Sequence, residues 1–177
     1  GSVDFGNVLC ELQIPGTPGA VAFGDLSGDG LDDLVVSAFS AEQYVVVTEV
    51  FEPQALEPLV GGGAPVCQYT SFDIAVPAQP SLAKIGDVTG DGINDLVACL
   101  AFSASICIAP GVSGGGVGEH FLLDSTGLPL RPFIGDFNGN GQNDVFALSG
   151  LGKRVNLCLS SSAGRLAGAR NYDSGLP

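Results

Sequence analysis

The stretch Gly24-Asp25-Leu26-Ser27-Gly28-Asp29-Gly30-Leu31-Asp32-Asp33-Leu34-Val35 decides the fold, because it occurs three times. The second copy spans residues 86–97 and the third spans residues 135–146. Counted from its first aspartate, each copy has oxygen-bearing side chains at positions 1, 3, 5 and 9. A short loop of this kind can place several oxygens around a hard divalent cation, and Ca²⁺ is the ion that such ligand sets typically bind. Glycine at position 6 allows the sharp bend, and position 7 offers its backbone carbonyl.

The repeat extends beyond these loops. The first aspartates are Asp25, Asp87 and Asp136, which lie 62 and 49 residues apart. A proline recurs at the same distance before each of them, as Pro18, Pro80 and Pro129. A period of about 60 residues is the length of one four-stranded unit. The sequence therefore predicts three units of the same design.

Each unit is predicted to be a set of short strands. Val and Ile enrichment between Gly, Pro and Ser is typical of strands of about 5–8 residues. In the first unit we expect strands at Ala20–Gly24, Asp33–Phe39, Gln43–Phe51 and Gln68–Val76. We expect surface turns at Glu52–Pro65 and at the glycine-rich Ser113–Gly118. Little helix is expected, because no window shows a 3.6-residue apolar period.

Length, composition and charge exclude several classes of protein. A chain of 177 residues can form one domain with a sizeable core. No apolar run is long enough to span a bilayer. The net charge of −13 argues against binding nucleic acid, whose backbone would be repelled. Eight loop aspartates contribute to that charge, so three bound Ca²⁺ ions would offset nearly half of it.

The five cysteines leave several pairings open. Their number is odd, so at least one thiol is free or pairs between chains. Cys99 and Cys107 flank a predicted hairpin, and a disulfide across it is one alternative; buried thiols that act as small apolar groups are the other. Without a Cys-x-x-Cys pair, and with His120 as the sole histidine, a transition-metal site is not expected.

The pattern Gly-Asp-x-[Ser/Thr/Asn]-Gly-[Asp/Asn]-Gly-x-x-Asp-[Leu/Val], repeated three times, resembles the FG-GAP repeat family. Those repeats form the β-propeller of integrin α-subunits and of many secreted bacterial proteins. The resemblance implies an all-β fold of β-propeller-type blades, each with four antiparallel strands. It also implies that the loop joining the first two strands of each blade binds Ca²⁺. The family's Gly-Ala-Pro after the second strand is missing here, which places the chain nearer the divergent bacterial repeats.

The resemblance assigns up to three Ca²⁺ ions, one to each loop. Positions 1, 3, 5 and 9 supply side chains, and position 7 supplies a backbone carbonyl. The implied metal ligands are Asp25, Ser27, Asp29, Leu31 and Asp33; then Asp87, Thr89, Asp91, Ile93 and Asp95; then Asp136, Asn138, Asn140, Gln142 and Asp144. The third loop has two carboxylates where the others have three, so we expect it to bind most weakly. An EF-hand is not expected, because position 12 is Val36, Ala98 or Ala147 instead of Glu.

The expected domain organisation is a single repeat domain over residues 1–177. It comprises an outer strand within residues 3–17, blade 1 at about 18–77, blade 2 at about 78–126 and blade 3 at about 127–177. Propellers typically close with four to eight blades. Three blades therefore predict a partial propeller, with three explanations: a fragment of a longer propeller, two chains that close a six-bladed ring, or an open three-blade sector. We favour a fragment or an assembly over a lone open monomer.

The function expected from this organisation is binding without catalysis. We expect a calcium-stabilised extracellular module, secreted or at the cell surface, that takes part in adhesion by binding a protein or glycan, with no enzyme activity. His120, beside Phe121, is expected to be an ordinary surface or packing residue. Two alternatives stay open at this point: a structural subunit that assembles edge to edge into a ring or filament, and the accessory domain of a secreted carbohydrate-active enzyme.

Overall fold

The structure, a computed structural model, describes residues 11–51, 68–100, 102–150, 154–161, 166 and 170–173. Within these residues the fold is all-β, as predicted, and the only helical element is a single 3₁₀ turn at Phe39–Ala41. None of the described helices is long and apolar enough to cross a membrane. The expected turn at Glu52–Pro65 lies outside the described residues, as do Cys10 and Cys67.

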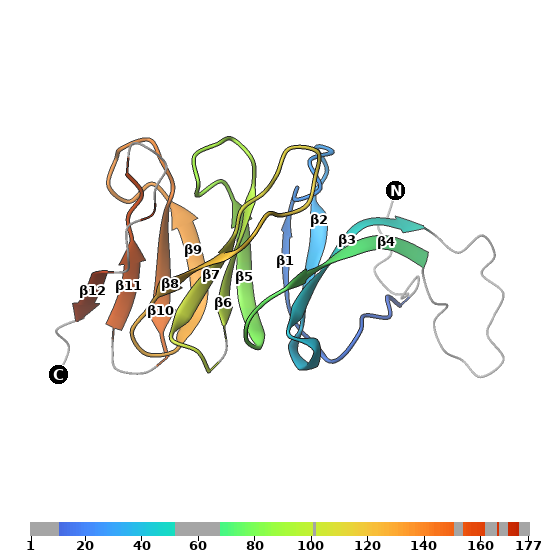
Figure 1. Ribbon diagram of the computed structural model, residues 1–177, viewed down its shortest axis with the longest axis horizontal. Coiled ribbons are helices and arrows are strands. Elements are labelled where there is room, and N and C mark those ends of the chain that lie inside the picture. The colour runs from blue at the N-terminus through green and yellow to red at the C-terminus, as the bar shows by residue number, and fades with distance from the viewer. Residues whose placement is uncertain are drawn as a thin grey trace, which may run out of the picture.

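The described residues contain twelve strands, which form three four-stranded antiparallel sheets, each a simple meander (Figure 1). The first sheet contains β1 (Pro18–Gly24), β2 (Asp33–Ala38), β3 (Gln43–Phe51) and β4 (Gln68–Ala75). The second contains β5 (Pro80–Gly86), β6 (Asp95–Leu100), β7 (Ser105–Ala109) and β8 (Phe121–Asp124). The third contains β9 (Pro129–Gly135), β10 (Asp144–Ser149), β11 (Arg154–Cys158) and β12 (Arg170–Asp173). The four strands predicted for the first unit are confirmed to within two residues at each end.

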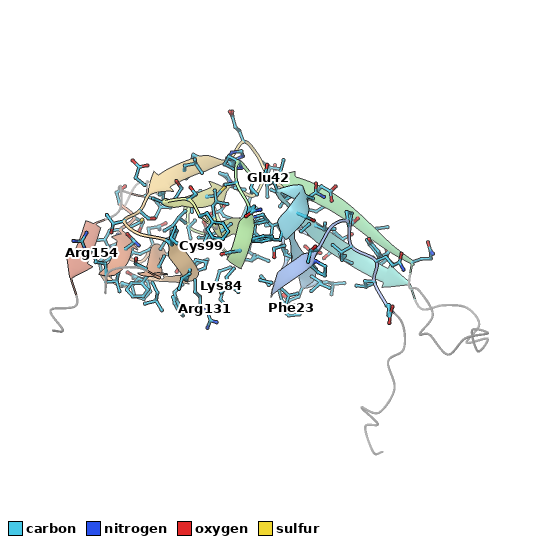
Figure 2. All side chains as sticks on the ribbon, turned by 90° about the horizontal axis from the view of Figure 1, so that it is seen from below. Phe23, Glu42, Lys84, Cys99, Arg131 and Arg154 are labelled. Atoms are coloured by element: carbon cyan, nitrogen blue, oxygen red, sulfur yellow. The ribbon has the colours of Figure 1, made fainter. Side chains whose placement is uncertain are left out.

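The sheets stack face to face in chain order, and their first strands lie nearest to one another. Strand β1 packs beside β5, and β5 packs beside β9. Figure 2 shows Phe23, Lys84 and Arg131, which come from these three strands, along one side of the molecule. We call the face that a sheet turns toward the next sheet along the chain its forward face, and the opposite one its backward face. In the part of the chain that the structure describes, the arrangement is an open sector of propeller-type blades with no closed barrel.

Two apolar layers hold the sector together. In the first, Val35 and Val46 of the first sheet meet Leu96 and Ala98 of the second. The second layer joins the other side of β6, at Val97 and Cys99, to Val145 and Ala147 of β10. Every residue of β6 is buried, because the middle sheet is covered on both faces. This explains its uninterrupted apolar run, Leu96–Leu100, in place of the alternation of a half-exposed strand.

The backward face of the first sheet has a separate, smaller apolar cluster. Ala38, Val45 and Val47 are buried there, with the partly buried Ile14 packed against them. Tyr69 donates a hydrogen bond to the backbone carbonyl of Gln13, which holds this segment in place. The outer strand expected within residues 3–17 lies mostly outside the described residues. In its described part, residues 12–17 form no strand and only Glu11 makes a bridge.

The described cysteines carry free thiols. Cys99 and Cys107 belong to neighbouring strands, but Cys99 faces the second apolar layer and Cys107 faces the first. The alternative that Cys99 and Cys107 form a disulfide across this hairpin is therefore wrong, because the two side chains point to opposite faces of the sheet. Burial raises the pKa of the Cys99 thiol to about 12 and that of Cys107 and Cys158 to about 11. These thiols stay protonated at neutral pH and act as small apolar groups.

Replacing Leu96, which is 1% exposed between the first two sheets, with alanine should lower the free energy of unfolding by about 2–5 kcal/mol, because a cavity is left in a packed layer. Urea denaturation followed by circular dichroism measures the change. Leu122→Ala on β8, where the side chain is 46% exposed, is the matched control and should cost much less. Equal costs for the two variants would contradict the stacked-sheet arrangement.

Candidate metal loops

The three predicted loops connect the first and second strands of each sheet, and all lie at the same edge of the stack, at the top of Figure 1. Their backbones share one curled shape. The glycines at positions 4 and 6 have positive φ angles in every copy, for example 79° at Gly28 and 87° at Gly30. Glycine adopts this left-handed conformation without the cost that a Cβ imposes. The loop shape is therefore built into the sequence pattern.

The aspartate at position 1 stabilises the curled loop by accepting hydrogen bonds from backbone N–H groups of the same loop. One oxygen of Asp25 accepts a hydrogen bond from the backbone N–H of Gly28 at 2.6 Å, and the other accepts from Gly30 at 2.9 Å. Asp87 and Asp136 make the same pair of bonds to the glycines of their own loops. Hydrogen bonding from backbone N–H groups, led by that of Gly141, lowers the pKa of Asp136. The charged form that a cation requires is thus favoured there.

The residue at position 5 caps the end of each loop. Asp29 accepts a hydrogen bond from the N–H of Leu31 at 2.8 Å, and Asp91 and Asn140 accept from the residues two further on. In the third loop the Asn140 amide also donates to the carbonyl of Ser160. Asparagine at this position keeps the turn but supplies no charge. This is consistent with the expectation that the third loop binds a cation least tightly.

The aspartate at position 9 anchors each loop to the second strand of its sheet. Asp33, Asp95 and Asp144 are at most 1% exposed. One oxygen of each accepts the N–H of position 2, at 2.7 Å from Leu26 in the first loop, with equivalent bonds in the other two. Burial raises the pKa of Asp95, against the opposing effect of its backbone hydrogen bonds. A buried carboxylate of this kind gains from any further positive charge brought near it.

The first loop differs from the others in one buried oxygen. The second oxygen of Asp95 accepts the N–H of Gly111 at 2.8 Å, and that of Asp144 accepts the N–H of Ser160 at 2.7 Å. The corresponding oxygen of Asp33, Oδ1, has no hydrogen-bond partner among the residues that the structure describes, and neither has the buried Oγ of Ser27. An unpartnered buried carboxylate oxygen is costly unless a cation or water meets it.

The residues present fit a Ca²⁺ ion in their donor chemistry, since every predicted ligand offers oxygen. Their arrangement is held by hydrogen bonds within the protein. Across the part of the chain that the structure describes, no three acidic, histidine or cysteine side chains converge into a group that could hold a metal ion. In the first loop the oxygens Asp33 Oδ1 and Ser27 Oγ are buried without a hydrogen-bond partner among the described residues, so they retain bonding capacity for an ion.

A glycine-rich loop of the second sheet packs against the first metal loop. It spans residues 110–118, runs from β7 toward β8, and reaches across to the first sheet (Figure 1). The N–H of Gly116 donates to the carbonyl of Leu26 at 3.1 Å. A Cβ on Gly115 would lie 2.2 Å from the carbonyl oxygen of Ser27, so only glycine fits. The predicted glycine-rich turn is confirmed, and its structural role is contact between neighbouring blades.

This contact forms one wall of an open cleft of about 800 Å³. The opposite wall is made by the outer strands of the first sheet. The cleft is lined by hydroxyl, carboxylate and aromatic side chains, namely Ser27, Asp29, Thr48, Glu49, Phe72 and Asp73. Lining of mixed polarity next to a candidate metal loop suits a hydrophilic ligand.

Sequence reasoning missed the residues that join one loop to the next. The side-chain amide of Asn94 donates to the backbone carbonyl of Asp25 at 2.9 Å, and that of Asn143 donates to the carbonyl of Asp87 at 2.8 Å. Both asparagines stand at position 8 of their loops. The recurrence of asparagine there was the available signal, but its partner lies in another blade and is invisible without the tertiary structure.

The chain is therefore a stack of β-propeller-type blades with candidate metal loops at one edge. Residues 17–46 match the family model described as FG-GAP repeat, so the chain contains an FG-GAP repeat there, as its sequence predicted. This match covers the first of the three predicted copies. That the second and third belong to the same family stays a prediction.

No curated protein matches the chain. Among solved structures, a chain of the Photorhabdus luminescens Tc holotoxin pore is similar, with 20% sequence identity and a TM-score of 0.47. The alignment covers 93% of this chain and 8% of the toxin chain. The present chain thus corresponds to a small part of that protein's length.

Replacing Gly115 with alanine should destabilise the protein, because the new methyl group would collide with the Ser27 carbonyl. Gly114→Ala is a close control: both glycines have a φ of 94°, but a Cβ at Gly114 meets nothing within 4 Å. Both variants place a side chain at the same positive φ, so the difference between their melting temperatures reports the contact with Ser27. We expect Gly115→Ala to melt lower by several degrees. Equal melting temperatures would contradict the packing of the two loops.

Proposed function

We propose that this protein is a calcium-stabilised, β-propeller-type binding module that catalyses no reaction. The observation that carries the proposal is the shared geometry of the three loops, each of which presents oxygens at the same five positions. The unpartnered Asp33 Oδ1 and Ser27 Oγ support a cation in the first loop in particular. A cation there would supply positive charge beside a carboxylate that is buried with half of its bonding capacity unused.

The role of calcium in this proposal is to stiffen the edge of the stack. Each loop connects two strands and packs against the neighbouring blade, through Asn94 to Asp25 and through Asn143 to Asp87. Holding the loops in one conformation therefore stabilises both the blades and the contacts between them. No element with two arrangements is required, so the proposed role is structural rather than regulatory.

An extracellular location and a role in adhesion belong to the same proposal. Extracellular calcium-binding modules work with dissociation constants of about 10⁻⁴–10⁻³ M, and such sites fill only where calcium is abundant. Loops with two or three carboxylates and wide exposure to solvent suit that range. The cleft beside the first loop supports the binding of a hydrophilic ligand, for which we propose a protein segment or a glycan. Glycan-array and adhesion assays with and without calcium test this part.

A second candidate function, a structural subunit that assembles edge to edge, is favoured by one observation. Large apolar side chains are exposed at both ends of the stack, with Phe23 at 65% on the first sheet and Phe137 at 53% on the third. Exposed apolar patches of this kind mark interaction surfaces. The mass in solution separates the two candidates, since a chain that stays monomeric at high concentration is not such a subunit.

Adding calcium should raise the melting temperature, and adding EDTA should lower it, because an ion bound only by the folded state stabilises that state. At a concentration 100 times the dissociation constant, one site contributes about 2.7 kcal/mol. Native mass spectrometry before and after chelation counts the bound ions and the chains together. Magnesium at the same ionic strength is the control. A melting temperature that ignores both calcium and EDTA would contradict the calcium proposal.

Removing a carboxylate from the first or second loop should cost more calcium-dependent stability than removing an amide from the third. Asp29→Ala and Asp91→Ala each delete a charged ligand, whereas Asn140→Ala deletes a neutral one, and ligand charge helps set calcium affinity. Isothermal titration with calcium measures the loss for each variant. Asp124→Ala, an exposed aspartate on β8 outside the loops, controls for the change in net charge. Equal losses in all four variants would contradict the assignment of ligands.

A further inference from the structure

The forward face of the third sheet is exposed where the corresponding faces of the first two sheets are buried. At position 2 of the loops, Leu26 and Val88 are 3% and 2% exposed, but Phe137 is 53% exposed. Two residues beyond β10's Phe146, Leu148 is 42% exposed, whereas its counterparts Ser37 and Cys99 are buried. In the first two blades, the side chains at these positions are buried against the next blade. In the third blade, the side chains at the same positions are exposed to solvent.

This exposed face is apolar and already shaped. Phe146 lies between Phe133 and Phe137, with ring centroids 5.9 and 6.0 Å away. Together with Ile134 and Leu148, these rings line a hollow of about 420 Å³. Aromatic rings at tilted angles and these distances pack favourably with one another. The face is thus ordered by its own contacts before anything covers it.

Two contacts recur at both interfaces between described blades. In each contact the preceding blade supplies one group, and the third blade has that group without its partner from a following blade. In the first contact, an isoleucine of the following blade packs against the glycine that directly precedes loop position 1. A Cβ on Gly24 would come within 2.8 Å of Ile85, and a Cβ on Gly86 would come within 3.3 Å of Ile134. The corresponding Gly135 has only Phe137 of its own blade nearby.

The second recurrent contact is the hydrogen bond from asparagine at position 8 to the carbonyl of the preceding blade. Asn94 donates to Asp25, and Asn143 donates to Asp87. By the same spacing, the carbonyl of Asp136 is the acceptor that a following blade would meet. An asparagine amide fits that acceptor because it donates without carrying charge.

From these repeated contacts we propose that the forward face of the third sheet binds a further blade of the same kind. Its partner must be a four-stranded sheet with isoleucine or a similar apolar residue opposite Gly135, and with asparagine at position 8 of its loop. The inference goes beyond the calcium proposal, because it concerns packing between sheets and requires no bound ion. The proposed requirement predicts which kind of blade can pack after the third one.

The first blade of a second copy does not meet this requirement. Its position 8 is Asp32, whose side chain lacks the amide N–H groups that asparagine would donate to the Asp136 carbonyl. Its backward face is also partly covered already, by Ile14 on Ala38, Val45 and Val47. The chemistry therefore favours a separate asparagine-bearing blade over head-to-tail pairing of identical chains.

The test extends the full chain by one blade. A copy of residues 81–126 is joined after Pro177. The sequence Gly175-Leu176-Pro177 is identical to Gly127-Leu128-Pro129, so Pro177 takes the place of Pro80, and the added blade carries the asparagine of position 94. Hydroxyl-radical footprinting then reports the accessibility of Phe137 and Leu148, with calcium present throughout. We expect the modification rates of both residues to fall several-fold relative to the unextended chain. Unchanged rates would overturn the proposal.

The matched control carries N94D in the added copy alone, which reproduces the aspartate of the first blade. Protection of Phe137 should be clearly weaker with this copy, and equal protection would overturn the asparagine requirement. Sedimentation of the unextended chain supplies the remaining arm. Concentration-dependent dimers in which Phe137 is protected would assign the face to a second copy and overturn the proposal.

A second variant tests the same rule inside the unextended chain and does not depend on the folding of an added blade. Asn143→Asp removes the donor to the Asp87 carbonyl and places a charge beside it. Hydrogen exchange at the N–H of Val88 should then speed up by roughly tenfold, as expected for the loss of a partly buried hydrogen bond from the same peptide group. Gln68→Glu, which also converts an amide to a carboxylate but at an exposed position of β4 outside the loops, is the control. Unchanged exchange at Val88 in Asn143→Asp would overturn the rule.

Discussion

The structure depends on a buried carboxylate at the start of the second strand of each sheet. Asp33, Asp95 and Asp144 are almost completely removed from solvent, and each accepts a backbone N–H from the loop that precedes it. An ionised group in this position is stable only with several donors around it. The aspartate therefore attaches the loop to the second strand, and the loop connects that strand to the first.

The same loops determine how one blade meets the next. The backbone carbonyl of the aspartate at loop position 1 accepts a hydrogen bond from an asparagine amide of the following blade. The glycine before this aspartate packs against an isoleucine of that blade. A motif of a dozen residues thus serves two purposes, a candidate ion site within the blade and a docking point between blades. Changes to the loop that spare the proposed metal ligands can still disrupt the stack, because the two sets of contacts use different atoms.

Differences among the three copies show how far the repeat can vary. The second and third blades give their buried aspartate a partner from the segment after the third strand, Gly111 or Ser160. In the first blade the equivalent position is Glu49, which stays within β3 and pairs with Thr70 beside a bulge. The Asp33 oxygen is left without that donor. The first loop is consequently the one whose chemistry is least complete without a bound ion.

The sequence by itself determined the all-β class, the repeat, the strands of the first unit and the positions of the loops. These follow from local chemistry: glycines with positive φ, aspartates that accept nearby N–H groups, and strands bounded by turns. Only the tertiary structure decided that Cys99 and Cys107 face opposite layers, that Gly115 touches Ser27, and that Asn94 and Asn143 bridge consecutive blades. Each of these depends on which residues from distant parts of the chain share a face. Periodicity along the chain records the direction of a side chain, but its partner is set by how the sheets stack.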